Sequence, residues 1–350
     1  MIQVKTADYL RKNDKPPFII AEAGINHNGE LEKAYQMIEV AKNAGADCIK
    51  FQTFKADEFV GDPDQTYTYL SQGKEITESM LEMFKRYEFK KNDWSLIKKK
   101  CDEVGIVFLS TPQNRSDLDI LLEIGITAIK VGSDDFTNLP LLKSYAKTGL
   151  PMLVSCGMAD FAEVYQALET IGSLDEYPTV LFLCTSQYPT PAEDVNLNKL
   201  KTLSSAFPGL ILGFSDHTQG TLAASVAVGL GARVFEKHFT LDNNLPGPDH
   251  WFSANPEGLK DWINAIRISY TMLGSAKIKP TEKENNMKIL ARRSVVALID
   301  IQSEEIFTTQ NIGLRRPGNG LPPSLYLNIL GLKATKKISR GSLLKLGDLK

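Results

Sequence analysis

The stretch "ILGFSDHTQGTLAASVAVGLGARVFEKHFT", residues 211–240, contains two apolar runs separated by a helix-like segment. The runs, 211–217 and 233–239, are continuous rather than alternating, which is typical of parallel strands that are covered on both faces. The segment between them has helical spacing and ends near Gly231. Glycine readily adopts the left-handed conformation at a helix end. We therefore predict a strand–helix–strand unit in this stretch.

The same alternation recurs along most of the chain. Eight such units over roughly 250 residues predict an α/β fold, a (β/α)8 or TIM barrel. A doubly wound open sheet is the alternative, but "AEAGINHNGE", residues 21–30, lacks the G-x-G-x-x-G spacing that such a sheet carries after its first strand. The eight runs are 18–24, 48–54, 106–112, 128–133, 151–157, 179–186, 211–217 and 233–239.

The chain divides into a barrel of residues 1–280, a linker of residues 281–290 and a small β-rich domain of residues 291–350. The small domain contains a repeat, because "IDIQSEEIFTTQNI" (299–312) aligns with "KKISRGSLLKLGDL" (336–349). Within the barrel, the connection 55–94 is unusually long. Connections of this length often form lids or substrate walls.

Composition excludes several classes of protein. Forty basic residues against 42 acidic ones predict no nucleic-acid partner, and no run approaches the ~18 apolar residues of a membrane span. The start, "MIQVKTADYL", lacks the apolar core of a signal peptide. The four cysteines, without a Cys-x-x-Cys pair, are expected to be buried reduced thiols, and the expected location is the cytoplasm. They are Cys48, Cys101, Cys156 and Cys184.

In a barrel the carboxyl ends of the strands meet at one face, and functional sites form there. Lys50 and Lys130 lie inside apolar runs, where an ammonium group without an anion is costly. Hydroxyl groups at the same level favour a phosphate-bearing ligand. Two alternatives stay open: the lysines pair with Glu22 or Glu236, or one of them forms a Schiff base. The other residues expected at this face include Gln52, Thr111, Ser133, Asp135, Ser155, Ser186, Tyr188, Ser215, His217, Lys237 and His238.

Two of the four histidines, His217 and His238, end neighbouring runs at the same point. Adjacent strands lie about 4.8 Å apart, so we expect the two imidazoles to share one divalent cation. Two nitrogen ligands leave open positions, which is typical of a catalytic Lewis acid, and Mn²⁺ or Mg²⁺ is as suitable as Zn²⁺. Asp216 points the other way by the two-residue period, so we expect it to be structural. His27 and His250 stay unassigned.

These residues predict a barrel enzyme with a phosphate pocket and an open metal site. Such a site suits carbon–carbon bond formation between a phosphorylated three-carbon unit and a carbonyl compound. A metal-dependent aldolase or lyase that releases no phosphate is one alternative. A non-catalytic sugar-binding protein is another, but buried polar groups without a task are costly.

Several motifs together resemble the bacterial nonulosonic (sialic) acid synthase family, which includes N-acetylneuraminate, legionaminic and pseudaminic acid synthases. The resemblance covers nearly the whole chain. It implies that the tail is an antifreeze-like (SAF) domain, and that the chain forms a homodimer in which this domain covers the partner's barrel. The motifs are "IIAEAGINHNG" (19–29), "IKFQTF" (49–54), "FLSTP" (108–112), "IKVGS" (129–133), "GFSDHT" (213–218), "EKHFTLD" (236–242), "GPDH" (247–250) and "RRPGNG" (315–320).

The resemblance implies condensation of phosphoenolpyruvate with the open-chain aldehyde of a 2-acetamido hexose, with release of phosphate by C–O cleavage. His217 and His238 would hold Mn²⁺ or Mg²⁺, and Glu22 would be the acid/base. Phosphoenolpyruvate would be bound by Lys50, Thr111, Lys130, Ser133, Ser155, Ser186 and Ser215. The sugar would be bound by Gln52, Asp135, Tyr188, Asp249 and, from the partner subunit's tail, the residue equivalent to Arg316.

Two positions depart from the family's pattern. Asp134 and Asp135 stand where many members have Gly-Glu, so the carboxylate expected to hold the sugar is one methylene shorter. Ser186 stands where some members have asparagine. The sequence does not distinguish N-acetylmannosamine from a 2,4-diacetamido-trideoxy analogue as the acceptor.

Overall fold

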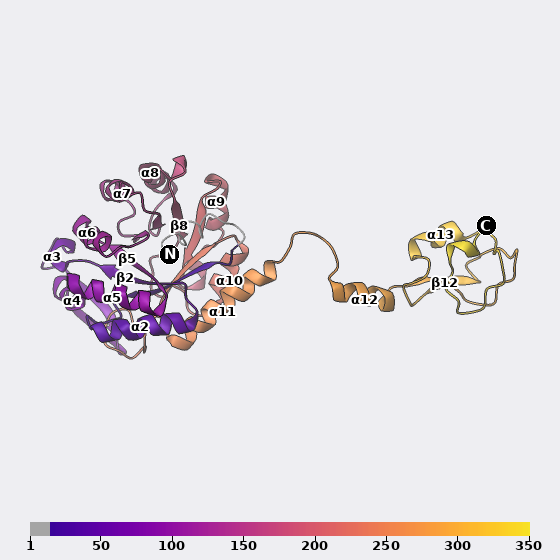
Figure 1. Ribbon diagram of the computed structural model, residues 1–350, viewed down its shortest axis with the longest axis horizontal. Coiled ribbons are helices and arrows are strands. Elements are labelled where there is room, and N and C mark those ends of the chain that lie inside the picture. Colours follow the sequence, from indigo (N-terminus) through magenta and orange to yellow (C-terminus); the bar gives the residue numbers. More distant parts are fainter. Residues whose placement is uncertain (1–14) are drawn as a thin grey trace. The chain divides into compact units, whose positions relative to one another are not determined.

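The computed structural model describes residues 15–350, which fold into two compact units. The first unit extends to Gly274 and the second comprises Ser275–Lys350. Figure 1 shows strands surrounded by helices in the first unit and a smaller, loop-rich fold in the second (Figure 1). The residues predicted to form a linker, 281–290, largely coincide with helix α12 (Glu282–Ala291) of the second unit.

Eight parallel strands form the wall of a nearly closed barrel in the first unit. Their order is β5-β2-β1-β10-β9-β8-β7-β6, and the two outer strands of this order lie in contact. The predicted (β/α)8 barrel is confirmed, and each strand lies within a predicted run or coincides with it. The strands are β1 (Phe18–Gly24), β2 (Cys48–Thr53), β5 (Val107–Pro112), β6 (Ile129–Val131), β7 (Met152–Ser155), β8 (Thr179–Leu183), β9 (Ile211–Ser215) and β10 (Val234–His238).

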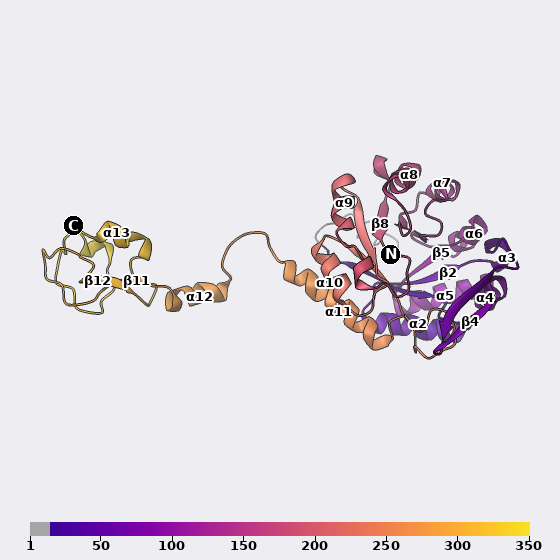
Figure 2. The same cartoon turned by 180° about the vertical axis from the view of Figure 1, so that it is seen from behind.

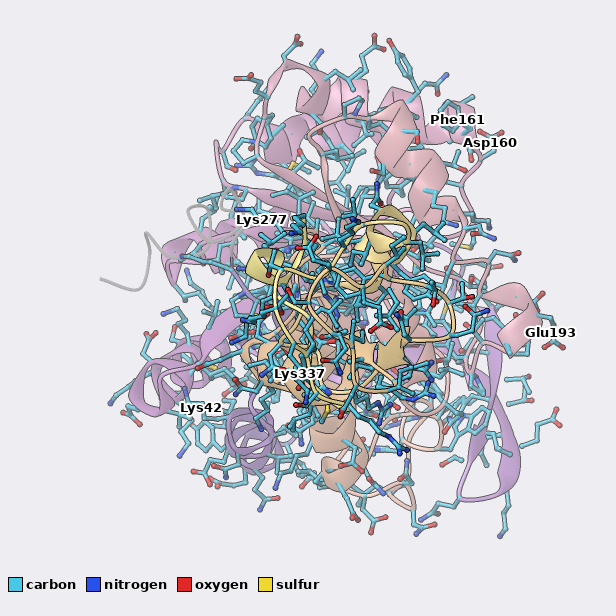
Figure 3. The ribbon with its side chains drawn as sticks, turned by 90° about the vertical axis from the view of Figure 1, so that its right-hand side faces the viewer. Lys42, Asp160, Phe161, Glu193, Lys277 and Lys337 are labelled. Atoms are coloured by element: carbon cyan, nitrogen blue, oxygen red, sulfur yellow. The ribbon has the colours of Figure 1, made fainter. Side chains whose placement is uncertain are left out.

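Helices cover the outside of the barrel. In α2 (Leu31–Ala44) the buried residues Met37, Ile38 and Ala41 recur at helical spacing, and the helix ends at Gly45 with φ 95°. Figure 3 shows Lys42 and Asp160, both exposed, on the outer surface (Figure 3). The other covering helices are α5 (Lys91–Val104), α6 (Arg115–Glu123), α7 (Leu139–Ala146), α8 (Phe161–Ile171), α9 (Lys199–Ala206), α10 (Leu222–Gly229) and α11 (Pro256–Leu273).

The barrel interior is filled by every second residue of the strands. Phe18 and Ile20 of β1, for example, pack inside with Phe182 of β8, whereas Ile19 and Ala21 pack outside against the helices. This alternation follows from the two-residue period of a strand. Its consequence is that the polar residues continuing the inward series emerge together at the carboxyl ends of the strands.

The long connection 55–94 folds into a β-hairpin flanked by short helices. The hairpin pairs β3 (Thr66–Ser71) with β4 (Lys74–Ser79), and it projects from the barrel unit (Figure 2). The flanking helices are α3 (Ala56–Phe59) and α4 (Met80–Tyr87). Residues of the hairpin line the pocket described below, which agrees with the predicted substrate wall.

The second unit is built on the predicted repeat. Ile301 and Ile338, which occupy matching positions of the two repeat copies, form an antiparallel bridge, and both are buried. Strands β11 (Ser294–Ala297) and β12 (Ile312–Arg315) also pair antiparallel, and α13 (Tyr326–Ile329) contributes Ile329 to the same small core. The repeat is therefore a structural one, in which two similar segments pack against each other.

Two findings bear on the expectations from composition. All four cysteines are free and buried, as predicted. Among residues 15–350, no helix is both long and apolar enough to cross a membrane.

Replacing Gly213 by alanine tests the packing of the barrel interior. The added Cβ would lie 2.6 Å from Cδ1 of Phe182, so we expect overpacking to lower the free energy of unfolding by about 1–3 kcal/mol. Gly229→Ala is the control, because its Cβ meets no atom within 4 Å. Urea unfolding followed by tryptophan fluorescence reports on the barrel, which contains all three tryptophans. Equal midpoints for wild type and Gly213→Ala would contradict the prediction.

Candidate active site

A pocket of about 640 Å³ opens at the carboxyl ends of the barrel strands. Its floor consists of residues that continue the inward series of each strand: Glu22 follows Ile20, Lys50 follows Cys48, and Lys130 follows Ala128. Ser155, Ser215 and Glu236 enter the pocket in the same way from β7, β9 and β10. The register of the barrel therefore places these side chains at one level.

Two lysines and two carboxylates form a buried network in this floor. Lys50 Nζ lies 2.9 Å from Glu22 Oε2 and 3.7 Å from Glu236 Oε1. Lys130 Nζ also lies 3.7 Å from Glu236 Oε1. The alternative in which the lysines pair with internal carboxylates is therefore correct for both. It does not exclude anion binding, because both lysines and both carboxylates also line the pocket.

The network sets the protonation of its members. Burial raises the pKa of Glu22 to about 7, although Lys50 opposes this shift. Burial also disfavours the charged form of Glu236, but the ammonium groups of Lys130 and Lys50 outweigh it and hold the pKa of this carboxyl below its ordinary value. Burial lowers the pKa of Lys130. Glu22 is thus the group of the floor that can both give and take a proton near pH 7.

Hydroxyl groups surround the two ammonium groups. Lys50 Nζ donates to Thr111 Oγ1 at 3.2 Å, and Lys130 Nζ donates to Ser155 Oγ at 2.7 Å. Ser215 Oγ donates to Glu236 Oε1 at 3.2 Å. Alternating cations and hydroxyl donors are suited to an anion with several oxygen atoms, such as a phosphate or a carboxylate.

A glycine makes room for a second group of hydroxyls. A Cβ on Gly157 would lie 2.4 Å from Ser186 Oγ, 2.7 Å from Ser133 Oγ and 2.9 Å from Cys184 Sγ. The backbone N–H of Gly157 donates to Ser133 Oγ at 3.0 Å. Only a residue without a side chain can bring its backbone so close to these three groups.

His217 and His238 lie next to each other at the centre of the pocket, with ring centroids 5.7 Å apart. His217 Nδ1 lies 2.7 Å from the carbonyl oxygen of Thr185. It donates a proton there, so Nε2 keeps its lone pair. His238 Nδ1 is buried without a hydrogen-bond partner. Burial lowers the pKa of His217 to about 4 and that of His238 well below its ordinary value, so both rings are neutral near pH 7.

The two histidines have the form that metal ligands need. A ligating imidazole is neutral and its other nitrogen often donates to a carbonyl, as His217 does. Among residues 15–350, no group of three or more His, Cys, Asp and Glu residues is arranged to hold a metal ion. The two imidazole nitrogens by themselves would leave the other coordination positions of an ion open.

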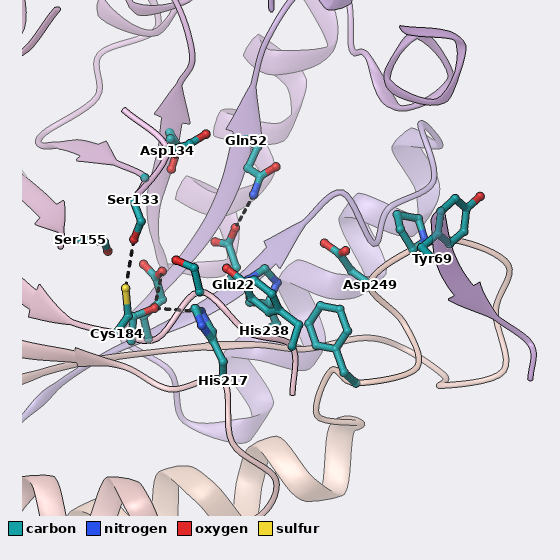
Figure 4. Close-up of a pocket in the computed structure, with 18 of the residues that line it drawn as sticks. Glu22, Gln52, Tyr69, Ser133, Asp134, Ser155, Cys184, His217, His238 and Asp249 are labelled. Atoms are coloured by element: carbon teal, nitrogen blue, oxygen red, sulfur yellow. Dashed lines mark hydrogen bonds between the residues drawn. The ribbon is translucent and has the colours of Figure 1, made fainter. Parts of the chain in front are cut away.

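Figure 4 shows how the labelled side chains are arranged in the pocket. Ser133, Ser155 and Cys184 lie toward one side, Asp249 and Tyr69 toward the other, and the two histidines lie between them with Glu22. The second side is built by the β3–β4 hairpin and by the loop that follows β10. Burial raises the pKa of Asp249, in that loop, to about 7.

Each of the two units matches the sequence model of a known family. The sequence model of the NeuB family matches residues 37–278, and that of the SAF domain matches residues 292–350. The chain belongs to the NeuB family. The resemblance recognised in the sequence motifs is thereby confirmed.

Individual relatives match this NeuB-family chain over most of its length. The N,N'-diacetyllegionaminic acid synthase of Legionella pneumophila is 40% identical over 332 residues, covering 93% of each protein. The N-acetylneuraminate-9-phosphate synthase of Homo sapiens is 35% identical over 326 residues, covering 91% of this chain and 88% of its own. The crystal structure of N-acetylneuraminic acid (sialic acid) synthetase from Leptospira borgpetersenii serovar Hardjo-bovis, in complex with citrate, has a TM-score of 0.70 and 33% identity, covering 78% of this chain and 90% of that chain.

The barrel of this NeuB-family protein brings most of the predicted site residues together. Asp135 is not among the described lining residues: its carboxylate accepts a hydrogen bond from Asn138 Nδ2 at 3.0 Å, and Asp134 lines the pocket instead. Arg316 is exposed in the second unit, so its expected position at a partner's barrel stays a prediction. The predicted residues that line the pocket are Glu22, Lys50, Gln52, Thr111, Lys130, Ser133, Ser155, Ser186, Tyr188, Ser215, His217, His238 and Asp249.

Sequence reasoning missed several lining residues of this NeuB-family pocket. The two-residue period would have found Asp134, counting on from Lys130, and Cys184, counting on from Phe182. Glu236 was expected at this face, at the end of its strand, and it does line the pocket. The residues of the hairpin had no such signal, because nothing in their sequence says which strand ends they reach.

Asp216 is structural, as its position in the strand pattern predicted. It faces away from the pocket, and its Oδ2 accepts a hydrogen bond from Trp262 Nε1 at 2.8 Å. Lys237 Nζ lies 3.3 Å from the same oxygen, so Lys237 also faces away from the pocket and the expectation that it belongs to the functional face is wrong. The pair therefore fastens the barrel wall to α11.

Asp249→Asn tests the buried carboxyl in the loop after β10. The pKa of Asp249 is raised to about 7 in the folded protein, so the native state binds a proton that the unfolded chain releases near pH 4. Wild type should therefore lose stability between about pH 4 and pH 7, and the amide should not. We expect the free energy of unfolding of Asp249→Asn, relative to wild type, to rise by about 4 kcal/mol across this window and to stay level above it, because one pKa unit corresponds to about 1.4 kcal/mol.

The measurement is urea unfolding at a series of pH values. Asp261→Asn, at an exposed position of α11, is the matched control. A constant difference between Asp249→Asn and wild type from pH 4 to pH 8 would contradict the burial of this carboxyl.

Proposed function

We propose that this NeuB-family protein is a nonulosonic acid synthase. It condenses phosphoenolpyruvate with an open-chain 2-acetamido hexose, either N-acetylmannosamine or a 2,4-diacetamido-trideoxy analogue, and releases phosphate. The observation that carries the proposal is the pair of buried ammonium groups, Lys50 and Lys130, beside two neutral imidazoles in one pocket. The names of the relatives, which include legionaminic and N-acetylneuraminate-9-phosphate synthases, support it.

The floor of the pocket binds phosphoenolpyruvate, which carries a phosphate and a carboxylate. Lys50 and Lys130 supply the positive charge. Thr111 and Ser155 accept hydrogen bonds from these lysines, so their own hydroxyl hydrogens are left to donate to oxygen atoms of the ligand. Ser215 donates to Glu236 in the same floor. A low-dielectric floor strengthens these interactions relative to water. The lysines thereby fix the enol carbon in place before the sugar arrives, which lowers the entropic part of the barrier.

His217 Nε2 and His238 would hold Mn²⁺ or Mg²⁺, which supplies a positive charge for the oxygen of the sugar aldehyde when it is bound. Burial keeps both rings neutral and therefore ready to ligate. The hydrogen bond from His217 Nδ1 to the Thr185 carbonyl fixes the orientation of its ring.

Glu22 moves the protons of the reaction. The π electrons of the C2=C3 bond of phosphoenolpyruvate form a bond from carbon 3 to the aldehyde carbon, which leaves carbon 2 electron-deficient. The π bond of the aldehyde opens, and the protonated Glu22 gives its proton to the aldehyde oxygen. Water then adds to carbon 2, and Glu22 takes a proton from it, which restores its starting state. The tetrahedral product expels phosphate by cleavage of the bond between carbon 2 and oxygen, and its remaining hydroxyl proton leaves with the phosphate. A pKa of about 7 suits both roles.

One observation favours a second candidate, a Schiff-base aldolase. Burial lowers the pKa of Lys130, which raises the share of its nucleophilic amine. Against it, Lys130 Nζ already donates to Ser155 and lies near Glu236. An aldolase would release no phosphate, and borohydride would trap its carbonyl substrate on Lys130.

Phosphate release tests the proposed function. Full-length protein is supplied with phosphoenolpyruvate, Mn²⁺ and either N-acetylmannosamine or 2,4-diacetamido-2,4,6-trideoxymannose. We expect phosphate release to depend on the presence of a sugar. Chelation of the metal should abolish the release, and Mn²⁺ should restore it. When the bridging oxygen of phosphoenolpyruvate is labelled with ¹⁸O, the label should appear in the released phosphate. No release with either sugar from folded protein would overturn the proposal.

His238→Ala tests the centre of the site. Loss of this imidazole should lower kcat by at least about 10³-fold, because charge stabilisation at the aldehyde is the main catalytic effect expected. Circular dichroism and thermal unfolding should stay close to wild type. Turnover near the wild-type rate would refute the role of the two histidines.

We propose further that the protein forms a homodimer in which Arg316 reaches the partner's barrel. Arg316→Ala should raise KM or lower kcat by about tenfold. Arg315→Ala, the neighbouring exposed arginine, is the matched control and should behave as wild type. Co-expression of Arg316→Ala with His238→Ala should restore activity, because mixed dimers contain one site with both residues. No restoration would contradict a contribution from the partner.

A further inference from the structure

The loop that follows β10 supplies one side of the pocket. It contributes Pro248, Asp249, Trp251 and Phe252 to the lining, and Figure 4 shows Asp249 beyond the two histidines (Figure 4). We call residues 240–253 the Asp249 loop. These residues contain no helix or strand, so contacts of side chains, rather than a ladder of backbone hydrogen bonds, must fix the conformation of the loop.

One chain of hydrogen bonds joins this loop to the turn after β1. His250, in the loop, is buried, and its Nε2 lies 3.0 Å from Oδ1 of Asn28. Asn28 Nδ2 donates to the carbonyl oxygen of Pro246 at 2.9 Å. On the other side of the ring, Nδ1 of His250 lies 2.6 Å from Oγ1 of Thr240. The ring therefore bridges the turn after β1, through Asn28, and the start of the loop, through Thr240.

The proton of the His250 ring can be placed from its partners. Burial lowers the pKa of His250 to about 4, so the ring is neutral near pH 7 and carries one N–H. The amide of Asn28 donates through Nδ2, so its Oδ1 is an acceptor and the N–H of His250 must be at Nε2. Nδ1 then accepts from the Thr240 hydroxyl, for which it is a nearer acceptor than the Asp242 carbonyl oxygen at 3.0 Å. The ring is thus held in a single orientation.

A second chain runs from Asn26 to the backbone of Asp249. Asn26 is buried, and its Nδ2 donates to the carbonyl oxygen of Phe239 at 2.8 Å and to Oγ of Ser253 at 3.0 Å. Ser253 Oγ in turn donates to the carbonyl oxygen of Asp249 at 2.6 Å. Asn26 therefore holds the residue just before the Asp249 loop and the last residue of the loop.

His27 shapes the turn that carries both asparagines. Its Nδ1 accepts a hydrogen bond from the N–H of Gly29 at 3.0 Å, and its ring stacks on Phe89 with centroids 4.3 Å apart. Asn28 has φ 53°, a left-handed conformation that asparagine tolerates better than most residues. The turn is therefore fixed by contacts of its own, and it presents Asn26 and Asn28 to the Asp249 loop.

A glycine allows the loop to pack closely against the His250 ring. A Cβ on Gly247 would lie 2.8 Å from Cδ2 of His250 and 3.2 Å from Oδ1 of Asn28. The N–H of the same glycine donates to Oγ of Ser71, the last residue of β3, at 3.1 Å. The absence of a side chain at Gly247 thus lets the loop meet the turn and the hairpin together.

The floor of the pocket is built differently. The ion pairs of Lys50 and Lys130 join residues of the barrel strands to one another. Asp249 and Phe252 depend instead on the conformation of the loop. Displacement of the loop would therefore change the side of the pocket beyond the histidines and leave the floor in place.

We propose that Asn26, Asn28 and His250 are positioning residues, which hold the Asp249 loop in the conformation in which Asp249 meets the acceptor sugar. The inference rests on the proposed function, in which the aldehyde lies at the histidines and the rest of the sugar extends toward this loop. Among the lining residues that the structure describes, none is one of these three, so each acts through the loop. The motifs "INHNG" (25–29) and "GPDH" (247–250) thereby form one unit.

Two variants test the first chain of hydrogen bonds in full-length protein. His250→Phe keeps a ring and removes both hydrogen bonds, and Asn28→Gly removes the amide at a φ that glycine adopts without strain. With an acceptor that wild type uses, either variant should raise KM for the sugar at least about tenfold and change KM for phosphoenolpyruvate by less than about twofold. His250→Gln should recover most of the loss, because its amide nitrogen can donate to Asn28 in place of Nε2.

The protonation of Asp249 gives a second measurement, which needs no activity. The pH-dependent difference in the free energy of unfolding between Asp249→Asn and its parent should shrink to less than about half when the parent is His250→Phe. The reason is that a displaced loop exposes the carboxyl and returns its pKa toward the ordinary value. Comparison within one background cancels the direct effect of His250 itself.

Asn196→Gly is the matched control for Asn28→Gly. Asn196 also has a positive φ, 49°, but it is exposed in the loop before α9, and its amide donates to the carbonyl oxygen of Asp194. This variant should behave as wild type in both measurements.

Equal rises in the two KM values, or a KM for the sugar at the wild-type value, would overturn the inference while the proposed function stands. A pH-dependent difference of undiminished size in the His250→Phe background would overturn it as well. If His250→Phe does not fold, Asn28→Gly takes its place in both measurements with the same expectations. No phosphate release from wild type with either sugar would overturn the proposed function, and the pH measurement would still decide whether these residues hold the loop.

Discussion

The ionic network in the barrel floor is the interaction on which the site depends. Transfer of Lys50, Lys130, Glu22 and Glu236 from water into the interior is unfavourable unless each charge meets a partner. The partners come from β1, β2, β6 and β10, so they meet only when these strands keep their register. A shift of one strand by a single residue would turn its inward side chains to the outer face. Barrel closure and site assembly are therefore one event.

The charge and polarity of the pocket lining change with distance from this network. The lysines and hydroxyl groups of the floor have the chemistry that suits an anion. Beside Lys50, burial raises the pKa of Glu22 to about 7. Farther out the imidazoles are neutral because they are buried next to cations that disfavour a further positive charge. Beyond them, the hairpin contributes rings and aliphatic groups. One cavity is thus lined, in order, by two lysines with hydroxyl groups, a carboxyl group with a raised pKa, two neutral imidazoles and the rings and aliphatic groups of the hairpin.

Most of the barrel and of the pocket floor could be predicted from the sequence, because the position of a strand and the direction of its side chains depend on nearby residues. Every predicted run contains a barrel strand, and Lys50 and Lys130 were recognised by their position in apolar runs. The sequence left open whether the two lysines pair with carboxylates or with a ligand. In the structure they lie next to Glu22 and Glu236, and they also line the pocket. The prediction that Asp135 lines the pocket was wrong for a physical reason. Asp135 lies beyond the end of β6, where the chain turns and the two-residue period no longer tells which way a side chain points.

The sequence by itself determined the barrel, its strand ends, the two histidines in register and the repeat of the second unit. The strands follow from continuous apolar runs, the helices between them from a period of 3.6 residues, and the repeat from the similarity of residues 299–312 and 336–349. Only the tertiary structure decided that Glu236 lies between both lysines, that Asp134 rather than Asp135 lines the pocket, and that the β3–β4 hairpin forms the pocket's far wall. These contacts join residues distant in the chain, such as Gln72 and Asn244, and no local pattern encodes which distant loops meet once the barrel has closed.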